Sequence, residues 1–208
     1  MNKVDRVIYT FWTGNNKMSS DRKNAFVGLA KNSQCPVLLI TPENLHKYTN
    51  YPMHEAFQYL SETHKADYLR THFMHYHGGG YSDIKNTTGS WLDCFTELEE
   101  SDKWMCGYPE LEGYAGDNWR SLIGNCSYIS KKLTPLSQEW YSSMIEVLDS
   151  KLELLKKYPA SHPQDTKDKS NYPLVWEEIL GHIFHRVCSN HTDKLLNSLP
   201  PNIFENYR

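Results

Sequence analysis

The sequence predicts an α/β protein with a mixed, mostly parallel sheet flanked by helices, and two observations support this. Residues 7–12 and 35–40 are apolar runs rich in β-formers, and a segment with helical spacing lies between them. Strand, helix and strand in this order indicate a parallel βαβ unit. The length of 208 residues suits one domain over residues 1–208, because a chain of this size buries roughly 70% of its unfolded surface.

The remaining elements follow from apolar spacing. The strand at 7–12 is expected to be buried, the segment 21–31 has helical spacing, and 35–40 should be a second buried strand. Further along the chain we expect helix 62–77, strand 81–85, helix 91–98, strands 103–108 and 122–129, and helices 139–157 and 175–187. Gly78 is a natural helix stop. The proline-bearing stretch 159–173 has no apolar period, which is typical of a lid, a binding loop or disorder.

Composition argues against a nucleic-acid partner and a membrane span, and it indicates the state of the cysteines. Lys and Arg total 22 against 25 Asp and Glu, a net charge of -3, so we expect no nucleic-acid partner. The five cysteines are widely spaced and form no CxxC pair, which predicts free thiols and a reducing, cytoplasmic compartment. No apolar stretch approaches the length of a membrane span.

The helix at 62–77 carries a pair of opposite charges. Asp67 and Arg70 are three residues apart and share a helix face. Arg70 can present a planar cation to phosphate oxygens, and Asp67 can accept hydrogen bonds from hydroxyls. The alternative is an exposed ion pair that contributes little to stability.

The glycine-strand segment that follows adds further polar groups. Alternation along strand 81–85 places Tyr81, Asp83 and Lys85 on one face. Three glycines precede them and permit a close approach of backbone to a ligand, although a helix stop explains at least one. Ligands of parallel sheets lie at the carboxyl ends of the strands, which puts Trp12 and Thr13 near a pocket mouth. The alternative for Trp12 is a core position. Together these features predict a sugar-nucleotide site.

At this point the sequence resembles a known family. Lys65-Ala66-Asp67-Tyr68-Leu69-Arg70, followed by Gly78-Gly79-Gly80-Tyr81-Ser82-Asp83, resembles the donor-binding signature of DXD-type glycosyltransferases with the Rossmann-like GT-A fold. It is similar to the capsular-polysaccharide, Och1-like and large clostridial toxin groups, and to N-terminal glycosyltransferase domains of larger chlorella-virus proteins. Phe11-Trp12-Thr13-Gly14 resembles their strand-end tryptophan, which stacks on uracil, and Gly124-Asn125-Cys126 resembles their mid-domain asparagine segment.

The resemblance implies transfer of a hexose or deoxyhexose from a UDP-sugar such as UDP-glucose to a glycan hydroxyl, with retention. It implies that Asp67 holds ribose or sugar hydroxyls, Arg70 the sugar or diphosphate, Tyr81 the ribose or phosphate region, and Asp83 the first position of DXD. The implied donor-binding set is Thr10, Phe11, Trp12, Thr13, Asp67, Arg70, Gly79, Gly80, Tyr81, Ser82, Asp83, Lys85 and Asn125. Implied partners are the UDP-sugar donor, a glycan acceptor and further domains of a longer polypeptide, in the host cytoplasm for a viral protein.

Lys85 departs from the family pattern. It stands where the family has a second aspartate, usually the direct ligand of Mn²⁺ or Mg²⁺. Two aspartates plus a divalent ion sum to zero charge, and so do one aspartate plus one lysine without a metal. Because Asp83 is kept, we expect a retained Mn²⁺ or Mg²⁺ at Asp83, with His182 as a further candidate ligand. The alternative is that Lys85 supplies the positive charge itself.

The other candidate groups are weaker. His72, His75 and His77 do not gather on one helix face, and we expect a solvated helix end. A carboxylate base is needed only for inverting transfer, with Glu110, Glu112 and Asp117 as the pool, so no catalytic residue is assigned. Two alternative functions stay open: a non-catalytic sugar-nucleotide or glycan-binding module, supported by Lys85, and a metal-dependent hydrolase built on the histidines.

Overall fold

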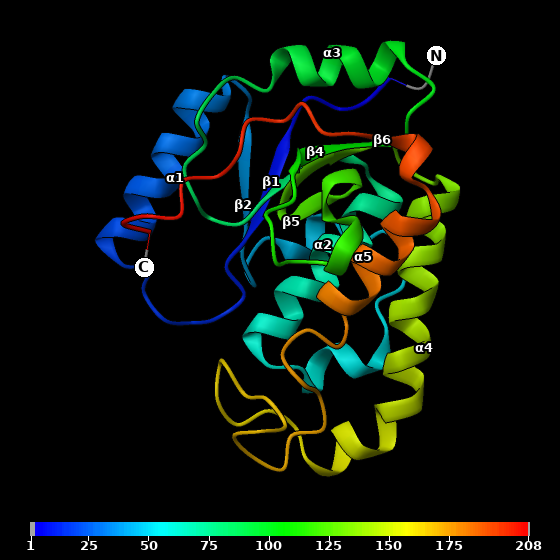
Figure 1. Ribbon diagram of the computed structural model, residues 1–208. Helices are drawn as coiled ribbons and strands as arrows, with labels where there is room; N and C mark the ends of the chain where they lie inside the picture. The colour runs from blue at the N-terminus through cyan, green and yellow to red at the C-terminus, as the bar shows by residue number, and fades with distance from the viewer. Residues whose placement is uncertain (1–2, 208) are drawn as a thin grey trace.

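The computed structural model describes residues 3–207, and within them six strands form one sheet flanked by five α-helices (Figure 1). The strands are β1 (Ile8–Phe11), β2 (Val37–Ile40), β3 (Gly79–Ser82), β4 (Met105–Pro109), β5 (Ile123–Ser130) and β6 (Leu195–Leu196). The helices are α1 (Ser20–Ser33), α2 (Glu62–Tyr76), α3 (Leu92–Glu100), α4 (Pro135–Lys157) and α5 (Gly181–Asn190). The predicted α/β class is confirmed.

The sheet is mixed and mostly parallel, in the order β2-β1-β3-β5-β4-β6. β1 runs parallel to β2 and β3, β4 runs parallel to β6, and β5 is antiparallel to both of its neighbours. The first three elements form the predicted parallel βαβ unit, with Ile8 paired to Val37 and Phe11 to Ile40. β2 is an edge strand, and this corrects the expectation of a second buried strand: of its four residues only Ile40 is buried.

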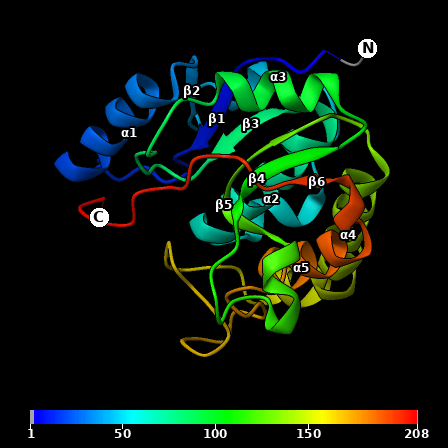
Figure 2. The same ribbon diagram turned by 45° about the horizontal axis from the view of Figure 1, so that its top comes forward.

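Each face of the sheet has its own hydrophobic core, because successive side chains of a strand point to opposite faces. Ile8 packs on one face with Leu29 of α1 and Phe95 of α3. Tyr9 packs on the other face, where α2, α4 and α5 supply most of the apolar partners. Figure 2 shows the same division, with α1 and α3 above the sheet and α2, α4 and α5 below it.

Helix α2 is buried along almost its whole length. Ser61 caps its N-terminus, and Gly78, at φ +70°, ends it by donating its N–H to the Phe73 carbonyl at 3.0 Å. The expected solvated end is wrong, since His72 and His75 are 0% and 3% exposed beneath α4. Burial, with the neighbouring His77 and His75, lowers the pKa of His72 to about 4.

Two helices, α4 and α5, begin several residues away from the start that the spacing predicts. α4 starts at Pro135 instead of residue 139, because Thr134 forms a capping box with Ser137 and proline suits the first turn. α5 starts at Gly181 instead of residue 175. The Val175 carbonyl accepts hydrogen bonds from His64 and from the Glu178 N–H, and the segment 175–180 forms turns.

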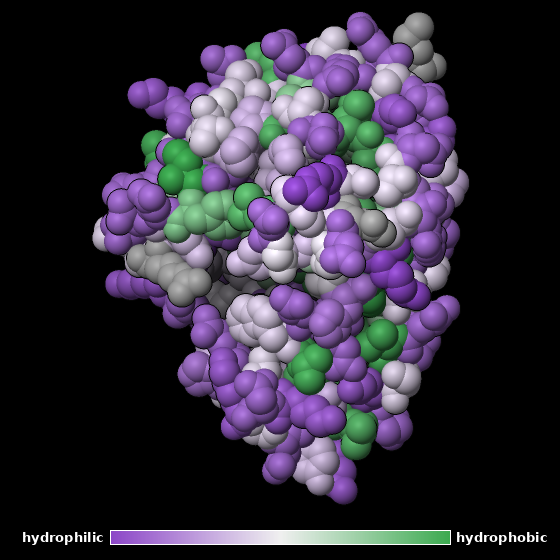
Figure 3. All heavy atoms as spheres, viewed as in Figure 1, coloured by the Kyte–Doolittle hydropathy of each residue, from purple (hydrophilic) through white to green (hydrophobic). Residues whose placement is uncertain are grey.

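The surface in Figure 3 is largely hydrophilic, with hydrophobic residues in small separate patches. Across residues 3–207 there is no helix of the length and apolarity that crossing a membrane requires. All five cysteines lie in this range and are free thiols, as predicted.

The glycine at position 79 generates a prediction about the fold. Gly79 has φ +85°, and a Cβ there would lie 3.1 Å from the carbonyl oxygens of Asp5 and Val7. We expect Gly79→Ala to lower the free energy of unfolding by about 2 kcal/mol or more, since both a left-handed backbone and a close contact oppose the methyl group. Gly113→Ala is the matched control, because Gly113 has φ +87° with nothing within 4 Å. Urea denaturation of both variants measures the change. Equal losses in the free energy of unfolding would contradict a contribution from the close contacts at Gly79.

Candidate functional site

A cavity of about 960 Å³ opens at the carboxyl ends of β1 and β3. Its walls come from the segment after β1, the first half of α2, the residues after β3, the start of β5 and the segment 163–181. Nine of the predicted donor-binding residues line it: Phe11, Trp12, Thr13, Asp67, Arg70, Tyr81, Asp83, Lys85 and Asn125. The fold therefore gathers residues from four distant parts of the sequence into one site.

Four predicted donor-binding residues lie behind the cavity wall and do not line it: Thr10, Gly79, Gly80 and Ser82. Thr10 and Ser82 are buried in the sheet. A Cβ on Gly80 would lie 3.1 Å from Ile8 and from Trp91, so this glycine is required by packing inside the protein. Their side chains do not reach the cavity, so these residues can affect a ligand only by positioning the backbone of the strands that end there.

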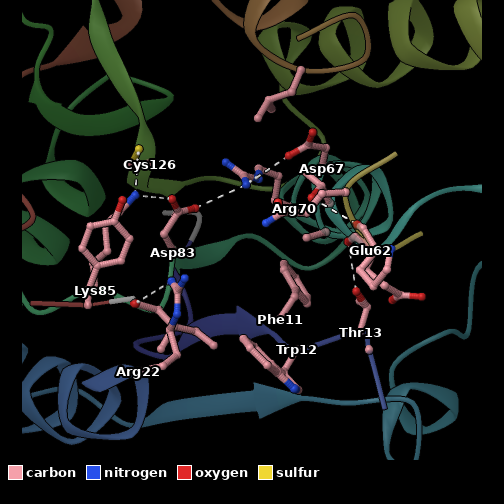
Figure 4. A pocket seen from close by; sticks show the side chains of 18 of the residues that line it. Phe11, Trp12, Thr13, Arg22, Glu62, Asp67, Arg70, Asp83, Lys85 and Cys126 are labelled. Carbon is pink, nitrogen blue, oxygen red and sulfur yellow. Dashed lines mark hydrogen bonds and ion pairs between the residues drawn. The ribbon is translucent and has the colours of Figure 1, made fainter. Parts of the chain in front are cut away.

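Alternating charges form a row along one side of the cavity, which we call the charge row: Asp67, Arg70, Asp83 and Lys85 (Figure 4). Arg70 lies 3.1 Å from Asp67 and 3.3 Å from Asp83, and Lys85 Nζ lies 2.5 Å from Asp83 Oδ2. The side chains of Arg70 and Asp67 are only 9% and 6% exposed. The alternative of an exposed ion pair is thereby excluded.

The charge row is tied to its surroundings by further hydrogen bonds. The Tyr81 hydroxyl donates to Asp83 Oδ1 at 2.6 Å, and Arg70 Nη1 donates to the Asn125 carbonyl at 2.9 Å. The guanidinium carbon of Arg70 lies 4.5 Å from the centre of the Tyr81 ring. These contacts fix the row relative to β3 and β5.

The two carboxyl groups of the row have opposite pKa shifts. Burial raises the pKa of Asp67 to about 7, although Arg70 opposes the shift. Burial also acts to raise the pKa of Asp83, but the charges of Arg70 and Lys85 outweigh it and hold that pKa well below its usual range. Asp83 is consequently ionised under ordinary conditions, whereas Asp67 exchanges its proton near neutral pH.

Aromatic side chains form the opposite wall. The indole N–H of Trp12 donates to the Asn16 carbonyl at 2.8 Å, which fixes the ring at the mouth of the cavity. The Thr13 hydroxyl donates to the Glu62 carbonyl at 3.0 Å and holds the strand end against α2. Phe11 stacks on Tyr81, with ring centres 5.6 Å apart. Trp12 thus lies at the cavity and not in the core.

The sequence prediction missed several residues that line the cavity: Lys17, Arg22, Glu62, Lys169 and Trp176. Arg22 was detectable, since it starts the helix that follows the first strand and therefore lies at the carboxyl edge of the sheet. Lys169 belongs to the stretch 159–173, for which a binding loop is one of the predicted interpretations. Trp176 and Glu177 lie in residues 175–187, whose apolar spacing predicts a packed helix, so the spacing alone does not place either side chain at this cavity.

The residues at Asp83 do not fit a divalent ion in the arrangement observed. Both carboxylate oxygens of Asp83 are engaged, one by Tyr81 and Arg70 and the other by Lys85. His182 is 65% exposed, pairs with Glu177 at 3.6 Å and lines a different cavity. Within the described range, residues 3–207, His, Cys, Asp and Glu side chains gather nowhere in a group of three that could hold a metal. The retained Mn²⁺ or Mg²⁺ stays a prediction, which these contacts do not support.

The smaller cavity, of about 340 Å³, adjoins the first and shares Glu177 and Gly181 with it. The pool of candidate bases lies outside the larger cavity: Glu110 is buried 2.7 Å from His185, and Glu112 and Asp117 are exposed. Glu177 is an acidic residue that lines both cavities.

Comparison with known proteins gives a fold but no family. No protein-family model matches the chain, and no curated protein matches its sequence. A solved structure titled "PaToxG Glycosyltransferase" superposes with a TM-score of 0.53 over 90% of this chain and 69% of the other, at 13% identity. The chain therefore shares the overall fold of that structure, with the mixed sheet that the sequence predicts.

The raised pKa of Asp67 generates a pH prediction. The carboxyl has a pKa of about 7 in the folded state and an ordinary value of 3.8, so between these values the folded state binds more protons and its stability falls as pH rises. The side chain in Asp67→Asn is neutral at every pH, so this variant does not lose stability in this way as pH rises. We expect its free energy of unfolding, relative to the wild type, to increase from pH 4 to pH 8, by up to about 1.4 kcal/mol for each unit of the pKa shift.

Urea denaturation across this pH range measures the difference, with Asp193→Asn at an exposed carboxyl as the matched control. A difference between Asp67→Asn and wild type that is constant with pH would contradict the raised pKa.

Proposed function

We propose that this protein is a nucleotide-sugar-dependent glycosyltransferase that moves a hexose or deoxyhexose from a UDP-sugar to a glycan hydroxyl. The observation that carries the proposal is the cavity at the strand ends, with an aromatic wall on one side and the charge row on the other. Its occurrence in a glycosyltransferase fold supports the same function.

The two walls suit the two ends of a nucleotide sugar. In the proposed binding mode uracil stacks on Trp12, and the diphosphate lies against Arg70 and Lys85. The transferred sugar then reaches Asp67, whose carboxylate accepts hydrogen bonds from hydroxyls. Arg22 and Lys169 also line the cavity and add positive charge for the phosphates.

We place the acceptor in the smaller cavity, which adjoins the larger one at Glu177 and Gly181. Glu177 lies between the two cavities, where it can accept a hydrogen bond from the acceptor hydroxyl. His182 and Arg186 line the smaller cavity and suit the polar groups of a glycan.

The reaction we propose retains the anomeric configuration, on the strength of the family resemblance. The bond between the anomeric carbon and the β-phosphate oxygen breaks, and the electron pair stays on that oxygen. The acceptor oxygen bonds to the anomeric carbon from the same face, and its proton passes to the leaving phosphate. No protein base is required, in keeping with the position of Glu110, Glu112 and Asp117 outside the larger cavity.

We also infer a cytoplasmic location, the host cytoplasm for a viral protein, with further domains of a longer polypeptide as partners. The five free thiols support a reducing compartment.

Turnover of UDP-sugars tests the proposed function. Purified protein should release UDP slowly from a UDP-sugar such as UDP-glucose even without acceptor. We expect Asp83→Ala to reduce this rate by about 100-fold or more, because Arg70 and Lys85 lose the carboxylate that positions them. Asp102→Ala removes an exposed carboxyl, 71% exposed, and serves as the matched control.

Liquid chromatography of the released UDP measures the rates, with a set of UDP-sugars and glycan acceptors. Binding of a UDP-sugar without hydrolysis or transfer in any combination would favour the rival function, a non-catalytic sugar-nucleotide-binding module.

The aromatic wall generates a second prediction. Removal of a ring that stacks on a base costs about 1–3 kcal/mol, so Trp12→Ala should weaken UDP binding roughly tenfold to a hundredfold, whereas Trp12→Phe should lose less. Trp119 does not line the cavity, so Trp119→Ala is the matched control. Isothermal titration calorimetry with UDP measures the effect. Equal affinity in the wild type and Trp12→Ala would show that uracil binds elsewhere.

A further inference from the structure

Lys85 is a buried cation at the point where a diphosphate would bind. Its side chain is 7% exposed, although it lines the larger cavity. Its ammonium donates to Asp83 Oδ2 at 2.5 Å and to the Cys126 sulfur at 3.5 Å. A lysine in such a place loses its hydration, and the contact with Asp83 compensates for this loss.

Aromatic rings of the C-terminal tail enclose the same ammonium. The ring centres of Phe204 and Tyr207 each lie 5.0 Å from Lys85 Nζ. The tail is anchored by Asn202, which donates to the Ser82 hydroxyl at 3.1 Å, and by the Ile203 N–H, which donates to the Asn86 carbonyl at 2.8 Å. Figure 1 shows this last part of the chain crossing the sheet towards α1. Asp83 and the two rings therefore hold the lysine in place beside the cavity.

The charge of Lys85 matches that of the group it replaces. An aspartate and a divalent ion together carry −1 + 2 = +1, which is the charge of one lysine. When Asp67 and Asp83 are both ionised, they balance Arg70 and Lys85, and the charge row sums to zero without any ion. A divalent ion added at Asp83 would meet both cations within 3.3 Å of that carboxylate. It would leave a net charge of +2 with Asp67 ionised, and a larger positive charge with Asp67 protonated.

We propose that Lys85 takes the place of the divalent ion and binds the donor diphosphate directly, so that donor binding and transfer are independent of metal. This inference rests on the proposed function. An ammonium has three N–H donors; one stays on Asp83, while phosphate oxygens displace the weakly accepting Cys126 sulfur. When the sugar–phosphate bond breaks, the leaving oxygen gains one negative charge, which Lys85 and Arg70 stabilise.

The assignment makes Asp83 a positioning residue for Lys85 and Arg70 instead of a metal ligand. It also accounts for the retention of Asp83 where the second aspartate is absent. A lysine that replaced a metal ligand in a decayed site would have no need of a buried carboxylate and two aromatic rings around it.

Titration calorimetry with UDP, in EDTA and in Mn²⁺, tests the inference. We expect the wild type to bind UDP with the same affinity, within about twofold, in both solutions. Lys85→Met should weaken binding in EDTA by about 30-fold or more, since a charge-assisted hydrogen bond to phosphate is lost. Lys85→Arg, which keeps the charge, should lose less. Lys31→Ala, at an exposed lysine in the last turn of α1, is the matched control.

Two further measurements separate a direct role from a structural one. Uridine has no phosphate, so Lys85→Met should bind it as the wild type does, and the ratio of UDP to uridine affinity should fall at least about tenfold. Lys85→Asp recreates the family motif and should bind UDP only with Mn²⁺. Thermal unfolding of each variant establishes that it is folded.

The outcomes distinguish this inference from the proposed function. Wild-type binding of UDP that disappears in EDTA and returns with Mn²⁺ would overturn the role of Lys85 and leave the proposed function intact. An equal loss of UDP and uridine affinity in Lys85→Met would also overturn it. Failure of the wild type to bind UDP in either solution would overturn the proposed function itself.

Discussion

The pairing of buried charges across two elements is the constraint on which the arrangement of the cavity depends. Asp67 and Arg70 come from α2, and Asp83 and Lys85 follow β3. A buried charge is costly unless it has a partner, so the two elements must meet with their charges alternating. The connection allows this because Gly78 and Gly79 adopt positive φ and turn the chain within two residues from the end of α2 into β3.

The antiparallel direction of β5 completes the site. β1 and β3 are parallel and end at one edge of the sheet, where ligands of such sheets bind. Because β5 runs the other way, its beginning lies at the same edge, with Ser127 paired to Ser82 and the Asp83 N–H bonded to the Cys126 carbonyl at 2.8 Å. An all-parallel sheet would place the beginning of β5 at the opposite edge. Asn125 can therefore accept from Arg70, which extends the pairing to a third element.

Sequence patterns predicted the elements and the charge row well, and their surroundings poorly. Period and glycine placement locate β1, α1, α2 and the four charges, since these are local properties. The burial of His72 and His75 depends on α4, which comes some sixty residues later, so α2 seen alone has a polar face. Likewise, Glu177 reaches the cavity because residues 175–180 form turns, a consequence of the contact between His64 and the Val175 carbonyl that no local pattern encodes.

The two carboxyl groups of the charge row have different protonation behaviour because their environments differ. Arg70 lies beside both, so it cannot explain why their pKa values move in opposite directions. The difference comes from Lys85 and the Tyr81 hydroxyl, which reach only Asp83. Asp83 therefore stays ionised and positions the two cations Arg70 and Lys85. Asp67, with a pKa of about 7, can gain or lose a proton when a ligand binds. Pairs of titratable groups whose environments push their pKa values apart are typical of active sites. In this site Lys85 and the Tyr81 hydroxyl together make the two carboxyl groups different.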